Sequence, residues 1–198
     1  MIDDLLADLA TSPFALPLLF ALVLGDAFLV VIPGEAAVTA FAALSVLHGE
    51  PPIAAVVAVA AVAAFAGDAA CYAVGRTIGF DRWNWTRTRR VIALRAWAKR
   101  RLERSTAAIV FTARFIPFAR IAVNLTAGAE RLPAPRYLGL CALAAVSWAA
   151  YQSFIGAAIA RILPQSPVAA VAISIAVALL AGWALDVLLA RRVAPDAG

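Results

Sequence analysis

Five ionisable residues lie inside otherwise apolar stretches of this chain: Asp26, Glu35, Asp68, Arg114 and Arg120. A charged side chain at the centre of a membrane helix costs about 2.5–3.5 kcal/mol on insertion scales. Such residues therefore tend to face a cavity or one another, and they mark functional sites. The spacing alone also allows a plainer interpretation, in which the acids and arginines form a structural ion-pair cluster.

The two arginines suggest a phosphate site. Arg114 and Arg120 flank Pro117 and would lie about 240° apart on a straight helix. A turn at Pro117 would bring both guanidinium groups to one tip, beside the free amide groups that begin the next helical arm. This combination favours phosphate, because arginine stays charged and binds phosphate as a fork. Two polar residues on that arm, Asn124 and Thr126, are candidates to line the cavity.

The two acids flank a second break. Asp26 and Glu35 are nine residues apart and would face opposite sides of an unbroken helix, but a turn at Pro33 and Gly34 lets both face one cavity. Glu35 would then begin the second arm, where the helix dipole favours an anion. Carboxylates in a membrane cavity can exchange protons, so we expect these acids to couple movement to protons or to gate the path.

Asp68 belongs to the same proton-coupling or gating group, with a less defined role. It either faces the first hairpin or pairs with Arg76, two helical turns later. Cys71 and Cys141 lie in apolar runs and are expected to be buried small side chains. With His48 as the only histidine, we expect no metal site and no cofactor.

The composition identifies the environment of these residues. The chain has 198 residues, of which 64% are hydrophobic and 15% charged, and its mean hydropathy is +0.90. A soluble domain is about 45–50% apolar and about 25% charged. The figures exclude an ordinary soluble fold, a disordered chain, a coiled coil and a disulfide scaffold. They predict an integral membrane protein with room for at most about six or seven membrane segments.

We predict one all-α membrane domain, residues 1–198, built from two inverted repeats. Each repeat consists of a re-entrant, broken-helix hairpin followed by transmembrane helices, an arrangement that transporters use to build a site near the bilayer midplane. Residues 1–12 open the first repeat as a short amphipathic helix or a frayed start, and this acidic start is unlike a signal peptide. The first repeat, 1–79, has hairpin 14–47 and span 53–76. The second, 107–198, has hairpin 107–128 and spans 137–160 and 167–190.

A basic amphipathic segment over residues 80–106 separates the repeats. Nine of the seventeen basic residues fall between Arg82 and Arg104. Apolar residues recur there at helical spacing: Val91, Leu94, Ala98 and Leu102. We expect this helix to lie at the cytoplasmic membrane surface on anionic lipid, and the C-terminus, after Arg191 and Arg192, to be cytoplasmic as well. A juxtamembrane basic face makes nucleic-acid binding a poor alternative.

Three segments together resemble the DedA family, the bacterial branch of the VTT-domain (SNARE-associated) superfamily. Residues 111–120 and Ala127–Gly128 resemble its F-x-x-R-F-x-P-x-x-R…A-G signature. Asp26 to Glu35 resembles its paired-acid stretch, and residues 67–79 resemble its G-x4-Y-x2-G-R-x2-G segment. The likeness covers about residues 20–160. Two positions depart from the pattern, since Asp26 stands where Glu is more usual and Ala113 where Gly is common.

The resemblance implies a bacterial cytoplasmic-membrane flippase for undecaprenyl phosphate or a related polyprenyl phosphate, linked to the proton motive force, envelope stress and antibiotic tolerance. In that family paired acids and paired arginines are essential, which implies Asp26, Glu35, Arg114 and Arg120 here. The alternatives are a flippase or scramblase for a phospholipid such as phosphatidylethanolamine, a proton-coupled exchanger of small solutes or ions, and a scaffold that recruits partners through its basic helix. With one histidine, far from the arginines, a lipid phosphatase is disfavoured and we expect no enzyme. The sequence leaves open a homodimer.

Overall fold

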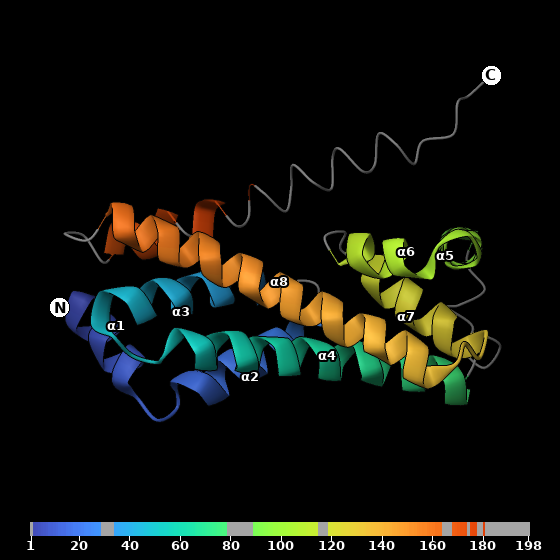
Figure 1. The fold of residues 1–198 in the computed structure, drawn as a ribbon, viewed down its shortest axis with the longest axis horizontal. Helices are drawn as coiled ribbons and strands as arrows, with labels where there is room; N and C mark the ends of the chain where they lie inside the picture. Colours follow the sequence, from blue (N-terminus) through green and yellow to red (C-terminus); the bar gives the residue numbers. More distant parts are fainter. Residues whose placement is uncertain are drawn as a thin grey trace, which may run out of the picture. The chain divides into compact units, whose positions relative to one another are not determined.

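The computed structural model is helical throughout its regular elements, as the composition predicts. It describes residues 2–28, 34–78, 89–114, 119–163, 168–173, 175–177 and 180. Helices α1 to α8 are bounded within these ranges (Figure 1). The predicted turn residues Pro33 and Pro117 lie outside the described residues, as do residues 79–88 and most of the predicted span 167–190.

The helices group into two compact units. Unit 1 comprises Met1–Ala64 and Ala145–Ala184, and unit 2 comprises Phe65–Ala144 and Leu185–Gly198. Unit 1 therefore holds α1 to α3, the first part of α4 and the last part of α8. Unit 2 holds the rest of α4, helices α5 to α7 and the first part of α8. The two long helices contribute to both units.

The chain begins with two short helices at a steep angle. Helix α1, Ile2–Thr11, is the predicted amphipathic helix, and α2, Ala15–Asp26, is almost wholly apolar. Their axes, taken over Asp4–Thr11 and Ala15–Asp26, differ by 88°. The turn between them is closed by Ser12, whose Oγ accepts a hydrogen bond from the backbone of Phe14 at 3.2 Å.

The predicted first hairpin appears as two helices in contact. Helix α2 packs against α3, Gly34–His48, which begins at the expected glycine. Helix α2 ends at Asp26, several residues before the predicted break at Pro33 and Gly34. The early end has a local cause, because Gly25 and Asp26 are both weak helix formers.

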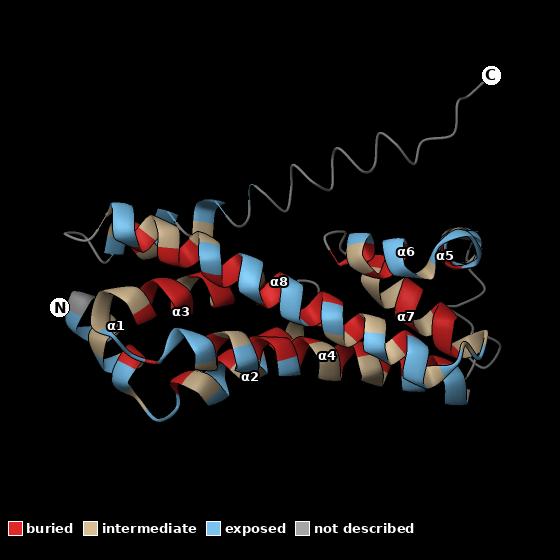
Figure 2. Cartoon of the chain, viewed as in Figure 1, coloured by how far each residue is buried: buried red, intermediate tan, exposed pale blue. Residues whose placement is uncertain are grey.

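Two helices are long and apolar enough to cross a membrane. They are α4, Ile53–Ile78, and α8, Ala134–Ile162, which contain the predicted spans 53–76 and 137–160. Only 39% of the spanning window of each is buried, and large apolar side chains such as those of Val62 and Phe154 are exposed. Figure 2 shows exposed positions along both helices. Apolar surface on this scale suits lipid and not water. The described residues thus hold two candidate spans, or three if the bent pair α1 and α2 forms one.

Unit 2 is built around short helices that pack on one another. Helix α5, Arg89–Arg104, contacts both α6, Thr106–Ala113, and α7, Ala119–Ala129. Ser105 caps the start of α6, and its Oγ accepts a hydrogen bond from the backbone of Ala108. The short helices α6 and α7 occupy the predicted second hairpin and contact each other.

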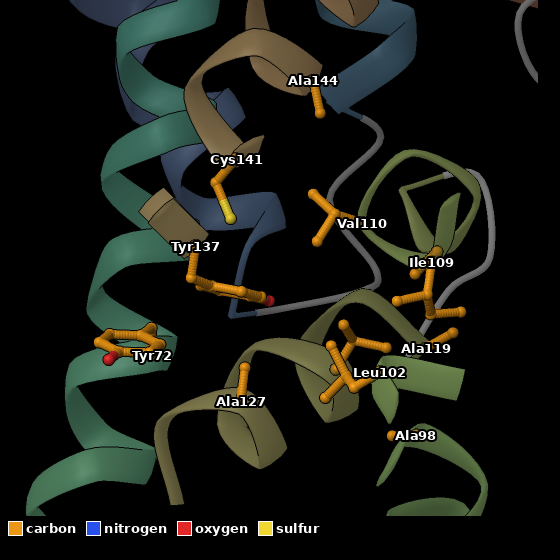
Figure 3. Packing of buried hydrophobic residues seen from close by; sticks show 12 residues of the cluster. Tyr72, Ala98, Leu102, Ile109, Val110, Ala119, Ala127, Tyr137, Cys141 and Ala144 are labelled. Carbon is orange, nitrogen blue, oxygen red and sulfur yellow. The ribbon is translucent and has the colours of Figure 1, made fainter. Parts of the chain in front are cut away.

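The apolar face of the basic helix packs partly against protein. Ala98 and Leu102 belong to the core cluster of unit 2, together with residues of α4, α6, α7 and α8 (Figure 3). At these two residues protein covers the apolar face of α5, because residues of α6 and α7 pack in the same cluster. The side chains of Val91 and Leu94 lie outside the described part. The basic residues from Lys99 to Arg101 remain exposed.

Candidate functional site

In unit 2 the backbones of α4 and α7 approach each other at two glycines. A Cβ added to Gly75 would lie 2.9 Å from the Cα of Leu125, and one added to Gly128 would lie 2.8 Å from the backbone nitrogen of Arg76. No larger side chain fits at either position without a backbone shift, as at the close helix crossings of membrane proteins. This approach brings α7 within reach of Asp68, two turns before Gly75.

Asp68 and Arg114 form a buried ion pair. Arg114 Nη2 donates a hydrogen bond to Asp68 Oδ2, and the side chains of Arg114 and Asp68 are only 2% and 4% exposed. Arg114 is the C-cap residue of α6, where the helix dipole favours a cation. Removing either partner would strand a buried charge, so each residue holds the other in the interior.

Two further groups, both on α7, point at the same carboxylate. Asn124 Nδ2 donates a hydrogen bond to Asp68 Oδ1 at 2.8 Å, and Arg120 Nε lies 3.9 Å from that oxygen. Arg120 and Asn124 are four residues apart and share one face of the helix. Arg114 and Arg120, which the sequence analysis paired across a break, therefore meet at Asp68. We call Asp68, Arg114, Arg120 and Asn124 the carboxylate cluster.

Helix α8 extends this network through residues that sequence reasoning did not select for the site. The Tyr137 hydroxyl donates a hydrogen bond to Asn124 Oδ1 at 2.7 Å, and Cys141 Sγ lies 3.9 Å from the same oxygen. Both residues are buried, and Figure 3 shows them in the core of unit 2. The available signal for Tyr137 was that a buried tyrosine hydroxyl needs a polar partner.

A second set of contacts, made by Tyr72 of α4, lies next to the carboxylate cluster. The Tyr72 hydroxyl donates to the backbone oxygen of Leu132 at 2.6 Å and accepts from Arg76 Nη1 at 2.8 Å. The rings of Tyr72 and Tyr137 stack with centroids 5.3 Å apart (Figure 3). Arg76 is thus engaged by Tyr72 and Leu132, and the proposed pairing of Asp68 with Arg76 is wrong. The reason is geometric, because Asp68 turns inward to α6 and α7.

The two acids of the first hairpin lie in unit 1. Glu35 is in the first turn of α3, as predicted, where the helix dipole favours its charge. Asp26 closes α2, and a Cβ added to Gly34 would lie 3.1 Å from Asp26 Oδ2. The Asp26 carboxylate therefore also lies at the start of α3. The break in the helix brings both acids to the same junction.

Thr126 does not join the carboxylate cluster. It is fully buried, and its hydroxyl has no hydrogen-bond partner among the described residues. Thr126 and Asn124 are two residues apart on α7, about 200° around the helix, so the two cannot line one cavity. Of the two predicted cavity residues, only Asn124 reaches Asp68.

The carboxylate cluster gathers two guanidinium groups and one carboxamide around the Asp68 carboxylate. Guanidinium and carboxamide N–H groups can donate to any oxyanion, and the charged arginines make the strong, short contacts that phosphate and carboxylate share. The described residues contain no group of three His, Cys, Asp or Glu that could hold a metal ion. The N–H groups of the cluster are donors of the kind that can bind an anion.

Long apolar helices with lipid-facing side chains, joined by short packed helices, define a multi-pass helical membrane protein. The model of the VTT domain matches residues 32–158, well over half of the chain. The chain therefore belongs to the VTT-domain (DedA/SNARE-associated) family, which is linked to the transport of lipids and solutes. The match includes the whole carboxylate cluster and Glu35, whereas Asp26 precedes it. No curated protein and no solved structure matches the chain.

Proposed function

We propose that this protein is a flippase that moves undecaprenyl phosphate, or a related polyprenyl phosphate, across the bacterial cytoplasmic membrane for reuse of the envelope lipid carrier. One observation carries the proposal: two arginines and a carboxamide converge on one buried carboxylate inside a membrane domain. Membership of a family linked to lipid and solute transport supports it. The protein acts as a transporter and not as an enzyme.

In this proposal Arg114 and Arg120 bind the phosphate headgroup. A phosphate monoester presents three terminal oxygens, and the two guanidinium groups and Asn124 Nδ2 provide donors for all three. The start of α7, where Arg120 lies in the first turn, adds backbone amide groups and a favourable dipole. The polyprenyl tail stays in the bilayer while the headgroup crosses.

Proton coupling is assigned to the acids. Asp26 and Glu35 lie together at the α2–α3 junction, and carboxylates inside a membrane protein are common proton carriers. Protonation would remove their charge and weaken their attraction for nearby cations. We propose that this change opens or closes the path of the headgroup.

The proposed topology has two inverted repeats with re-entrant hairpins that enter from opposite faces of the membrane. Residues 80–106 and the C-terminus are cytoplasmic, in line with the concentration of arginines there. The exposed Arg100, Arg101 and Arg104 of α5 then face anionic lipid headgroups. Since Ala98 and Leu102 are buried in protein, this contact is electrostatic and does not insert these side chains into lipid.

The test is translocation in proteoliposomes loaded with a polyprenyl phosphate. A phosphatase added outside removes only the headgroups of the outer leaflet, so the loss of protected headgroups reports transport. We expect Arg120→Gln and Arg114→Lys to slow this loss strongly, because each loses a guanidinium donor to phosphate. Arg136→Gln, which alters an exposed arginine of the same unit, is the matched control and should transport normally. Full translocation by both site variants would overturn the assignment of the headgroup site.

The same vesicles separate the alternatives. A phospholipid flippase or scramblase would move a labelled phosphatidylethanolamine and leave the polyprenyl phosphate protected. A solute exchanger would move solute or protons without changing headgroup exposure. A scaffold would move no headgroup. Its recruitment of partners or anionic lipid would be lost when Arg100, Arg101 and Arg104 become Gln, and would be kept in Arg120→Gln.

A further inference from the structure

Asp68 occupies the position that a headgroup would need. Its two carboxylate oxygens receive Arg114 Nη2 and Asn124 Nδ2, and Arg120 Nε approaches Oδ1 at 3.9 Å. These groups are the donors that the proposed function assigns to phosphate. The cluster is also closed, since the side chains of Asp68 and Arg114 are almost fully buried. A phosphate that binds at these donors would therefore compete with the Asp68 carboxylate for them.

We propose that Asp68 is an internal competitor for the lipid phosphate, which occupies the arginine site when no headgroup is bound and displaces the headgroup at the end of transport. This inference rests on the proposed function. It gives a physical reason for a carboxylate in a site that must attract anions. Between transport cycles the Asp68 carboxylate offsets positive charge on Arg114 and Arg120, and an uncompensated buried charge is expensive in a membrane protein.

Competition of this kind lowers the affinity for the phosphate headgroup and speeds the release of the headgroup. If Asp68 holds the donors in nine molecules out of ten, only a tenth of the protein is ready to bind, and the apparent affinity for phosphate is about tenfold below its intrinsic value. The bound headgroup is in turn opposed by a carboxylate that regains two hydrogen-bond donors and the charge of Arg120 when the headgroup leaves. A site without the competitor would bind more tightly and release more slowly.

The experiment compares Asp68→Asn with the wild-type protein in detergent micelles, using farnesyl phosphate as the probe. Farnesol, which has the same tail and no phosphate, reports tail binding alone. Glu130→Gln is the matched control, because it removes one carboxylate of the same unit, which pairs with Lys99. We expect Asp68→Asn to bind farnesyl phosphate about tenfold more tightly. Binding to Glu130→Gln, and the binding of farnesol throughout, should be unchanged.

Arg120→Gln distinguishes the headgroup site at the arginines from the role of Asp68 as a competitor. If it loses binding while Asp68→Asn binds no more tightly than wild type, the competitor role is wrong and the headgroup site stands. If all proteins bind farnesyl phosphate and farnesol alike, the headgroup site fails, and the competitor role fails with it.

The folding of Asp68→Asn is itself informative, because the variant removes a carboxylate that pairs with Arg114. A phosphate that takes the place of Asp68 should restore the missing anion. We therefore expect farnesyl phosphate, and not farnesol, to raise the melting temperature of Asp68→Asn more than that of wild type. A variant that folds only when purified with farnesyl phosphate supports the proposal, and one that stays unfolded with it overturns the proposal.

Discussion

The Tyr137 hydroxyl donates a hydrogen bond to Asn124 Oδ1 at 2.7 Å, and this contact decides which way the amide of Asn124 points. With its oxygen held by Tyr137, Asn124 presents its NH2 group to Asp68 at 2.8 Å. A flipped amide would place an oxygen against a carboxylate, an arrangement of two acceptors with no proton between them. Tyr137 therefore positions a donor of the cluster from another helix.

We expect Tyr137→Phe to weaken binding of farnesyl phosphate several-fold and to lower the free energy of unfolding by about 1–3 kcal/mol, because Asn124 Oδ1 loses a buried donor. Titration and thermal unfolding in detergent measure the two effects. Tyr151→Phe, which alters an exposed tyrosine of the same helix, should change neither. Unaltered binding by Tyr137→Phe would show that the orientation of Asn124 is set by other groups.

The ion pair between Asp68 and Arg114 predicts strong coupling between the two residues. Arg114→Gln should lower the free energy of unfolding by about 3–5 kcal/mol, because it leaves a buried carboxylate without its main partner. The double variant Asp68→Asn, Arg114→Gln should recover a large part of this loss. A double-mutant cycle by chemical unfolding in detergent measures the coupling. Additive effects would mean that the pair contributes nothing specific to stability.

The glycine contacts predict a steric effect. Gly75→Ala and Gly128→Ala should each lower the free energy of unfolding by at least about 1–3 kcal/mol, because the new methyl group meets backbone of the facing helix. Both should also weaken farnesyl phosphate binding, since α7 carries Arg120 and Asn124. Gly139→Ala is the matched control, with open space at its Cβ. It should stabilise α8 by about 0.5–1 kcal/mol. If all three variants had the same free energy of unfolding, the close approach of α4 and α7 at Gly75 and Gly128 would not explain the effect.

If the acids Asp26 and Glu35 carry the coupled protons, replacing them should leave headgroup binding intact and remove the response of translocation to a proton gradient. Asp26→Asn and Glu35→Gln should bind farnesyl phosphate as wild type does, while their translocation no longer responds to an imposed proton gradient. Parallel measurements in micelles and in proteoliposomes test this. Glu50→Gln, at an exposed acid between α3 and α4, should keep the response. A gradient response that survives in both variants would assign the coupling elsewhere.

The sequence predicted the features that depend on segment length and on the cost of placing charge in an apolar helix. Apolar runs of the right length predicted α4 and α8, and charge in apolar surroundings singled out Asp68, Arg114 and Arg120 before any contact was known. A break between the arginines was predictable from their angular separation and the intervening proline. The start of α3 followed from Gly34 in the same way.

The partners of Asp68 were not predictable, because they depend on packing between distant segments. Asp68 was equally able to meet Arg76 on its own helix, and only the approach of α7 at Gly75 and Gly128 directs it inward. Tyr137 was overlooked for the same reason. One tyrosine in a long apolar helix has no periodicity, and its role appears only once Asn124 stands opposite.

The contact between α4 and α7 also limits how the cluster can open. Their backbones touch with no side chain between them at Gly75 and Gly128, so one helix cannot slide past the other without losing that fit. Asp68, Arg120 and Asn124 are all carried by these two helices, whereas Arg114 is held at the end of α6. Three members of the cluster are therefore fixed relative to one another by one helix contact, and Arg114 reaches them from a separate helix.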